Sequence, residues 1–176
     1  MPRTARDIHV RPERPGDIDA IHAITAQAFG RPAEAHLVDA LRDQGLLALS
    51  LVAADAEALV GHVAFSPVDI VGPEREWAAA GLAPVAVRPD RQRRGIGDRL
   101  IREGFLRLRE AGVGIVVVVG HPDYYPRFGF VPASRHGITF PAPVPDEAFR
   151  VRELRVDALA GVGGEVRYAP PFDALD

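Results

Sequence analysis

The chain has 176 residues, of which 47% are apolar and 26% are charged, the usual balance of a soluble globular protein. It contains no cysteine, which excludes a disulfide framework, a thiolate nucleophile and thiolate metal sites. The formal net charge of -3 gives no general attraction to polyanions, so we expect neither nucleic acid nor membrane as a partner. Any site for an anion must therefore be local.

The sequence predicts one domain over residues 1–176, because it shows no linker, no internal repeat and no low-complexity segment. The longest apolar run, residues 115–119, is far shorter than the ~20 residues of a membrane helix. The first residues have no apolar signal core. These features predict a cytoplasmic protein.

The N-terminal half alternates between strand and helix signals. Apolar and polar residues alternate over residues 7–11, which predicts a strand, and Asp17 can cap the helix that follows. A second short amphipathic helix is predicted to stop at Gly45. Residues 47–53 and 59–70 predict an antiparallel hairpin.

The C-terminal half contains a strand, helix, strand unit. Residues 82–87 predict a buried strand, and an amphipathic helix follows it and ends at Gly112. Residues 115–119 are apolar on both faces, as expected of an interior parallel strand. Such a unit is a right-handed crossover, and a further strand is predicted at residues 149–156.

The turn between the strand and the helix of this unit reads Arg91-Gln92-Arg93-Arg94-Gly95-Ile96-Gly97-Asp98. Its two glycines let a ligand approach the backbone, and the first amides of the helix have no partner within the helix. The turn can therefore donate several hydrogen bonds to a phosphate at the positive end of the helix dipole. The alternative is a tight turn whose glycines serve packing and whose arginines face solvent.

Two common phosphate motifs do not fit this turn. A P-loop needs a lysine, and the chain has none, while a dinucleotide-binding fingerprint needs a third glycine where Leu100 stands. The pattern Gln92-x-x-Gly95-x-Gly97, placed between a buried strand and an amphipathic helix, instead resembles the acetyl-CoA signature of the GNAT superfamily of N-acetyltransferases.

The resemblance extends beyond this motif. It includes residues 82–87 before the turn, Tyr125-Pro126-Arg127-Phe128-Gly129-Phe130 after it, and Gly164-x-Val166-x-Tyr168 near the end, which together resemble the YhbS-like branch of the superfamily. The implied fold is α/β: a mixed, twisted sheet of six or seven strands flanked by helices and split at two central parallel strands.

The resemblance implies that acetyl-CoA is the co-substrate and assigns its contacts. The backbone of the strand would pair with the pantetheine amides, the amides of residues 93–98 would bind the pyrophosphate, and arginines, Arg88 included, would meet the remaining phosphates. We expect the Asp98 carboxylate to point aside, because it would repel a pyrophosphate. The implied cofactor-binding residues are Val85, Val87, Arg91, Gln92, Arg93, Arg94, Gly95, Ile96, Gly97 and Asp98.

Tyr125 matches the family tyrosine that lies near the cofactor sulfur, since it has the family's spacing to Gly129 and Phe130. The resemblance implies that its phenol protonates the departing thiolate as a general acid. The alternative is an aromatic plug that seals the acyl pocket. Substitution of the neighbouring Tyr124 by phenylalanine is predicted to be nearly silent.

The sequence does not identify a general base, because residues 78–87 contain no acid. Glu34, His62, Ser66 and Asp69 are candidates, each with a structural role as the alternative. No histidine shows metal-ligand spacing, so no metal is expected.

The resemblance predicts an enzyme that moves the acetyl group directly to a primary amine of an unidentified small-molecule or peptide acceptor, in a ternary complex. The alternative is a non-catalytic acyl-CoA-binding regulatory module. A homodimer is compatible with either.

Overall fold

The computed structural model describes residues 7–175. Residues 1–6, where the sequence shows no signal core, and residue 176 lie outside this range. In chain order the strands and α-helices are β1 (His9–Pro12), α1 (Ile18–Phe29), α2 (Ala33–Asp43), β2 (Leu49–Ala54), β3 (Leu59–Val71), β4 (Glu76–Val87), α3 (Ile96–Glu110), β5 (Ile115–Val119), β6 (Val131–Pro132), β7 (Ile138–Thr139), β8 (Phe149–Glu153) and β9 (Gly164–Tyr168).

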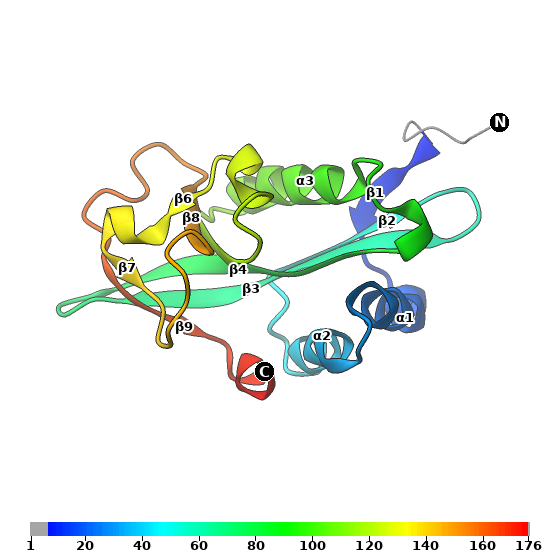
Figure 1. Ribbon diagram of the computed structural model, residues 1–176, viewed down its shortest axis with the longest axis horizontal. Helices are drawn as coiled ribbons and strands as arrows, with labels where there is room; N and C mark the ends of the chain where they lie inside the picture. The colour runs from blue at the N-terminus through cyan, green and yellow to red at the C-terminus, as the bar shows by residue number, and fades with distance from the viewer. Residues whose placement is uncertain (1–6, 176) are drawn as a thin grey trace.

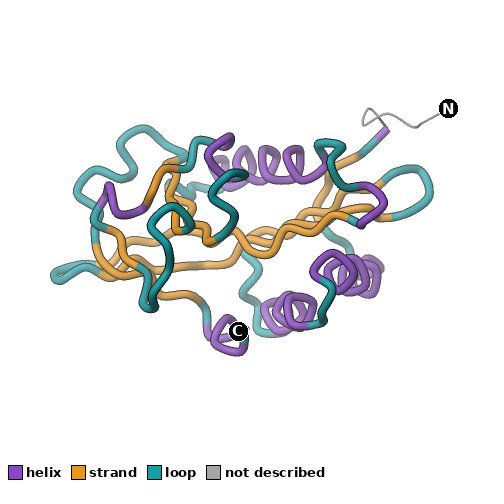
Figure 2. Tube along the Cα trace, in the orientation of Figure 1, coloured by secondary structure: helices purple, strands orange, loops and turns teal. Residues whose placement is uncertain are grey.

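All the strands belong to one mixed sheet with helices on both faces (Figures 1 and 2). The main path of the sheet runs β1-β2-β3-β4-β5-β8-β6, and β9 pairs with β3 and β7. Helix α3 covers one face, while α1 and α2 cover the other. Neighbouring strands are antiparallel except for the parallel pairs β4 with β5 and β7 with β9. The predicted fold class is confirmed.

Two details of the predicted sheet are wrong. Over residues 7–175 the sheet has nine strands and not six or seven, because β6 and β7 are two residues long and too short to show any alternation. Strand β4 begins at Glu76 and not at Leu82. Its first half pairs with β3 in a long antiparallel hairpin, and the alanines of residues 78–80 hid that half from pattern analysis.

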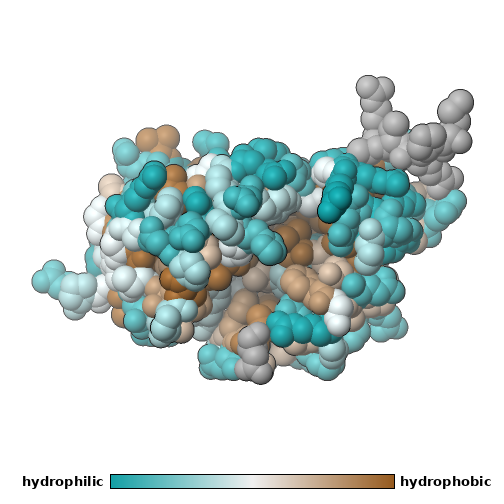
Figure 3. Space-filling model, in the orientation of Figure 1, coloured by the Kyte–Doolittle hydropathy of each residue, from teal (hydrophilic) through white to brown (hydrophobic). Residues whose placement is uncertain are grey.

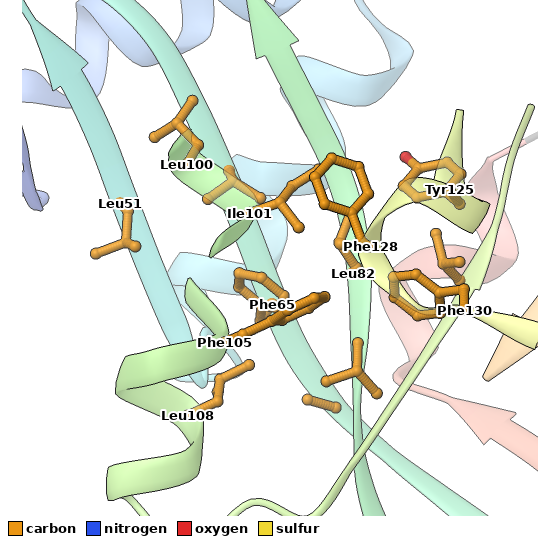
Figure 4. Packing of buried hydrophobic residues seen from close by; sticks show 14 of the residues in the cluster. Leu51, Phe65, Leu82, Leu100, Ile101, Phe105, Leu108, Tyr125, Phe128 and Phe130 are labelled. Carbon is orange, nitrogen blue, oxygen red and sulfur yellow. The ribbon is translucent and has the colours of Figure 1, made fainter. Parts of the chain in front are cut away.

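The largest part of the core holds α3 against the sheet. In Figure 4, Phe105 of the helix lies beside Phe65 of β3, Ile101 and Leu108 lie near the same ring, and Leu100 lies farther away. Helix and strand approach closely at Gly104, where a β-carbon would lie 2.5 Å from Phe65 Cε2. This packing fixes the N-terminus of α3 beside the end of β4.

Candidate active site

The sheet opens between its two central parallel strands. In the described part of the chain, β4 and β5 pair only at Ala80 with Val116 and at Gly81 with Val117. Strand β4 nevertheless continues to Val87, and β5 continues to Val119. The two strands therefore diverge beyond Gly81, which is the split that the motifs predicted.

A β-bulge shapes β4 at this split. Between the pairs Phe65 with Leu82 and Val63 with Val85, β4 advances by three residues while β3 advances by two. Pro84, inside the bulge, has no amide hydrogen to offer a neighbouring strand. Val85, one of the two residues predicted to pair with pantetheine, thus lies past the last residue of β4 that pairs with β5.

The turn between β4 and α3 has the backbone of an anion site. Arg93 and Gly95 both adopt left-handed conformations, with φ of 62° and 79°. The first hydrogen bond of the helix runs from the Arg99 amide to the Gly95 carbonyl over 3.1 Å. The amides of residues 96–98 come before this bond and therefore have no carbonyl partner within the helix. These amides lie at the positive end of a 15-residue helix, where an anion is stabilised.

The side chains of the predicted site divide into two groups. Arg88 pairs with Asp90 at 2.6 Å, and Arg91, whose side chain is 18% exposed, pairs with Asp55 at 2.8 Å. Gln92 Nε2 donates a hydrogen bond to the Val87 carbonyl at 3.0 Å. These contacts tie the turn to the rest of the protein, and the expected phosphate contacts of Arg88 and Arg91 stay predictions. The side chains of Arg93 and Arg94 are exposed.

Asp98 is held by Tyr124. The Tyr124 hydroxyl donates a hydrogen bond to Asp98 Oδ1 at 3.0 Å, and Arg127 lies 3.9 Å from the same carboxylate. Burial, together with the Asp98 charge, raises the pKa of the Tyr124 phenol. Because the Tyr124 hydroxyl contacts Asp98 in the first turn of α3, we revise the prediction that replacing Tyr124 by phenylalanine is nearly silent.

Tyr125 lies just beyond the end of β5, in the 3-10 turn of residues 125–128. Its side chain is buried, with 8% exposed, and its ring packs edge-on against Tyr124 and Phe130 at centroid distances of 5.1 and 5.8 Å. A β-carbon at Gly120 would overlap this ring. In Figure 4 the phenol oxygen points away from Phe130. Burial raises the pKa of Tyr125 to about 12, so the phenol is a protonated hydrogen donor at neutral pH.

A cavity of about 930 Å³ lies at the same split. It touches Leu82 and Ala83 of β4 and the end of β5 at Val119. Its other walls come from β9, from the loop after β7 and from the C-terminal 3-10 turn, Pro170–Ala174. The lining residues are Val71, Leu82, Ala83, Val119, Phe140, Pro141, Val144, Glu165, Val166, Arg167, Tyr168, Pro170, Phe172, Asp173 and Leu175.

None of the four candidate bases is among these lining residues. Glu34 is buried in an ion pair with Arg31, with Nε to Oε1 at 3.0 Å. Ser66 is buried in β3, and Asp69 is exposed on the same strand. Sequence analysis missed the acids that do face the cavity, Glu165 and Asp173, because no motif marks them.

His62 belongs to a polar network between the sheet and α1 and α2. Its Nε2 lies 2.7 Å from the Ser50 hydroxyl, which donates to Glu13, and Glu13 pairs with Arg42 at 2.8 Å. The ring is fully buried. Burial lowers the pKa of His62 to about 4, so the imidazole is neutral in the folded protein.

This network predicts a loss of stability in acid. Because the folded pKa of His62, about 4, lies below the ordinary 6.5, its neutral form stabilises the fold above pH 6.5, and this contribution falls as the pH drops toward 4. The loss is on the order of 3 kcal/mol in free energy of unfolding. Urea unfolding of the parent and of His62→Gln from pH 7.5 to 4 measures it. The parent should lose more stability than the variant, and parallel curves would contradict the assignment.

Within residues 7–175, no helix is long and apolar enough to cross a membrane. The same residues bring together no group of three histidine, aspartate or glutamate side chains that could hold a metal ion.

A mixed sheet that opens between two parallel strands, with a glycine-containing turn beside the opening and a cavity at it, is the arrangement that the resemblance to the GNAT superfamily implied. Residues 9–133 match the Acetyltransferase (GNAT) domain family. The chain belongs to the GNAT family and is an N-acetyltransferase, as the motifs predicted.

Close relatives support the same assignment. The chain is 42% identical over 165 residues to the uncharacterized N-acetyltransferase YhbS of Escherichia coli K12, covering 93% of this chain and 98% of that protein. The crystal structure of E. coli YhbS in complex with CoA has a TM-score of 0.92 and 38% identity, covering 100% of this chain and 96% of that one. A GNAT acetyltransferase from Brucella melitensis in complex with acetyl-CoA has a TM-score of 0.77 and 40% identity, covering 94% and 98%. The predicted YhbS-like branch is confirmed.

Proposed function

We propose that this enzyme moves the acetyl group of acetyl-CoA directly to a primary amine, without a covalent intermediate on the protein. The observation that carries the proposal is the split between β4 and β5, which lies next to the anion-binding turn and opens into the cavity. One site for a thioester and one for an acceptor thereby meet at a single opening. The complexes of the two relatives with CoA and acetyl-CoA support acetyl-CoA as the co-substrate.

The cofactor contacts follow from the backbone. We assign the pyrophosphate to the amides of residues 96–98 and the pantetheine to the backbone of Val85 and Val87. The Val87 carbonyl already accepts a hydrogen bond from Gln92. We therefore expect the backbone of Val85 to contribute more to pantetheine binding than that of Val87. The exposed guanidinium groups of Arg93 and Arg94 are the remaining phosphate ligands in this assignment.

The chemical step conserves atoms and charge. The neutral amine attacks the thioester carbonyl carbon, the carbon to sulfur bond breaks, and the amine loses its proton to water in the cavity. Tyr125 donates its proton to the departing thiolate and recovers one from solvent. The chain has no cysteine, and residues 7–175 bring no set of nucleophile, base and orienting group to the split, which favours direct transfer.

The alternative of a non-catalytic acyl-CoA-binding module has less support, because such a module needs no cavity for an acceptor at the split. A panel of amines incubated with purified protein and acetyl-CoA, with release of free thiol followed over time, separates the two functions. Thiol release that depends on an amine supports the transferase. Tight acetyl-CoA binding with no amine-dependent release would support the module. A single domain and a cytoplasmic location remain part of this proposal.

Tyr124→Phe is expected to weaken acetyl-CoA binding about tenfold. Without the Tyr124 hydroxyl, the Asp98 carboxylate loses the hydrogen bond that restrains it at the pyrophosphate site, and a hydrogen bond to a charged group is worth about 1.5–3 kcal/mol. Titration calorimetry measures the change. Asp98→Asn removes the charge and should bind acetyl-CoA at least as tightly as the parent. Unchanged affinity in Tyr124→Phe would show that Asp98 does not matter to the phosphate.

A further inference from the structure

The cavity at the split is apolar near the reaction centre and charged only at its rim. Hydrophobic side chains gather in the hollow between the β7 and β9 side of the molecule and helices α1 and α2 (Figure 3). The charged residues among the lining are Glu165, Arg167 and Asp173, all of them exposed. None of them belongs to β4 or β5, where the split lies. A polar acceptor body placed next to Ala83 would leave its hydroxyl or carboxylate groups unpaired, which is costly.

A row of edge-on rings forms one wall. The ring of Tyr168 lies 5.9 Å from that of Phe140 and 5.0 Å from that of Phe172, centroid to centroid. Phe140 in turn packs on Phe149 at 5.4 Å. Such a wall is complementary in shape and polarity to a planar or branched apolar group.

This wall reaches the split itself. A β-carbon at Gly81 would lie 3.0 Å from Tyr168 Cε1, so the ring lies directly against β4 at the last residue that pairs with β5. An apolar body that rests on Tyr168 therefore places its amine within reach of the opening between the strands.

The charges at the rim favour a cation. Glu165 and Asp173 are acidic, and the one basic lining residue, Arg167, has its guanidinium 3.8 Å from the Glu76 carboxylate. An ammonium group approaching the cavity is attracted, while a carboxylate is repelled, although exposed charges act weakly in salt. A cavity of about 930 Å³ also falls within the range of sites for small organic ligands.

We propose that the acceptor is a small primary amine with an aromatic or branched apolar body and no carboxylate, that is, an arylalkylamine or a similar apolar alkylamine. This inference rests on the proposed function, since it identifies the acceptor of that reaction. The amine nitrogen forms the new bond to the acetyl carbon, the bond from that carbon to sulfur breaks, and the products are the N-acetylamine and CoA thiol.

The test compares matched amines at fixed acetyl-CoA by release of free thiol. 2-Phenylethylamine and tryptamine are the apolar amines, phenylalanine and tryptophan add a carboxylate, and ethanolamine replaces the ring by a hydroxyl. We expect kcat/KM for 2-phenylethylamine to exceed that for phenylalanine and for ethanolamine by about a hundredfold. Equal or better use of phenylalanine or ethanolamine would overturn the proposal.

A variant in the ring wall links this selectivity to the cavity. Phe172→Ala removes a ring that packs on Tyr168, so KM for 2-phenylethylamine should rise about tenfold while acetyl-CoA affinity stays unchanged. Leu106→Ala, an apolar truncation at an exposed position of α3 outside the cavity, is the control and should leave both values unchanged. A Phe172→Ala protein that discriminates among the amines like the parent would contradict the cavity as their site.

Calorimetry with acetyl-CoA alone distinguishes a wrong substrate class from a wrong co-substrate. If the protein binds acetyl-CoA and acetylates none of the apolar amines, the substrate class is wrong and the co-substrate assignment stands. If acetyl-CoA does not bind, the proposed function is wrong and the substrate class is wrong with it.

Discussion

Tyr125→Phe is expected to lower turnover about a hundredfold while leaving acetyl-CoA affinity nearly unchanged. The substitution keeps the ring that packs on Tyr124 and Phe130 and removes only the proton that we assign to the departing thiolate. General acid catalysis typically contributes a factor of about 10² to 10⁴, which sets the expected size. Steady-state kinetics with an accepted amine, combined with calorimetry, measures both quantities.

The assignment of Tyr125 as the general acid also predicts how kcat depends on pH. Because burial raises the pKa of Tyr125 to about 12, the phenol stays protonated through the neutral range, and kcat should show no fall between pH 7 and 10 from its ionisation. Tyr124→Phe serves as the comparison, since it should change acetyl-CoA affinity and not kcat. Full turnover by Tyr125→Phe would reduce Tyr125 to an aromatic plug, and a loss of kcat in Tyr124→Phe alone would transfer the role to Tyr124.

Those parts of the site that lie close together in the chain could be predicted from the sequence. The turn of residues 91–98 is one continuous segment between a strand and a helix, and its glycines, one of them at φ of 79°, are visible as a motif. The parallel pairing of β4 and β5 also followed from an apolar strand, an amphipathic helix and a second apolar strand in sequence.

The acceptor side could not be predicted in the same way, because it is assembled from distant segments. Tyr168 reaches the cavity through the pairing of β9 with β3, and Phe172 through the turn that follows β9. On the cofactor side, the pairing of Arg91 with Asp55 was unpredictable for the same reason, because these residues are 36 positions apart. Periodicity shows which residues are buried, and it does not show which strands become neighbours.

The candidate bases show a second limit of prediction from sequence. His62 and Ser66 lie on β3 and pair with β4 residues at the split, but both side chains are buried and neither is among the residues that line the cavity. Alternation along a strand distinguishes its two faces and does not show which face borders a cavity. The acids that do line the cavity, Glu165 and Asp173, lie in β9 and the turn after it.

Gly97→Val is expected to reduce acetyl-CoA affinity by about a hundredfold or more while the fold survives. A β-carbon at Gly97 would lie 2.9 Å from the Tyr124 hydroxyl and 3.8 Å from Val87 Cγ2, so a branched side chain must displace Tyr124. It would also cover the first amides of α3, and the loss of two or more charge-assisted hydrogen bonds accounts for a change of this size. Calorimetry with acetyl-CoA measures the affinity, and circular dichroism with thermal unfolding measures the fold.

Gly95→Ala is the matched comparison. It strains the backbone of the same turn without placing a side chain over the first amides of α3. Gly95 has a φ of 79°, and no atom beyond its neighbours in the chain lies within 4 Å of a β-carbon built there. A side chain at this position costs roughly 1–2 kcal/mol of backbone strain, so Gly95→Ala should lower the melting temperature and weaken binding far less than Gly97→Val does. If folded Gly97→Val binds acetyl-CoA like the parent, the pyrophosphate does not lie on the N-terminus of α3, and the cofactor must enter the split by another route.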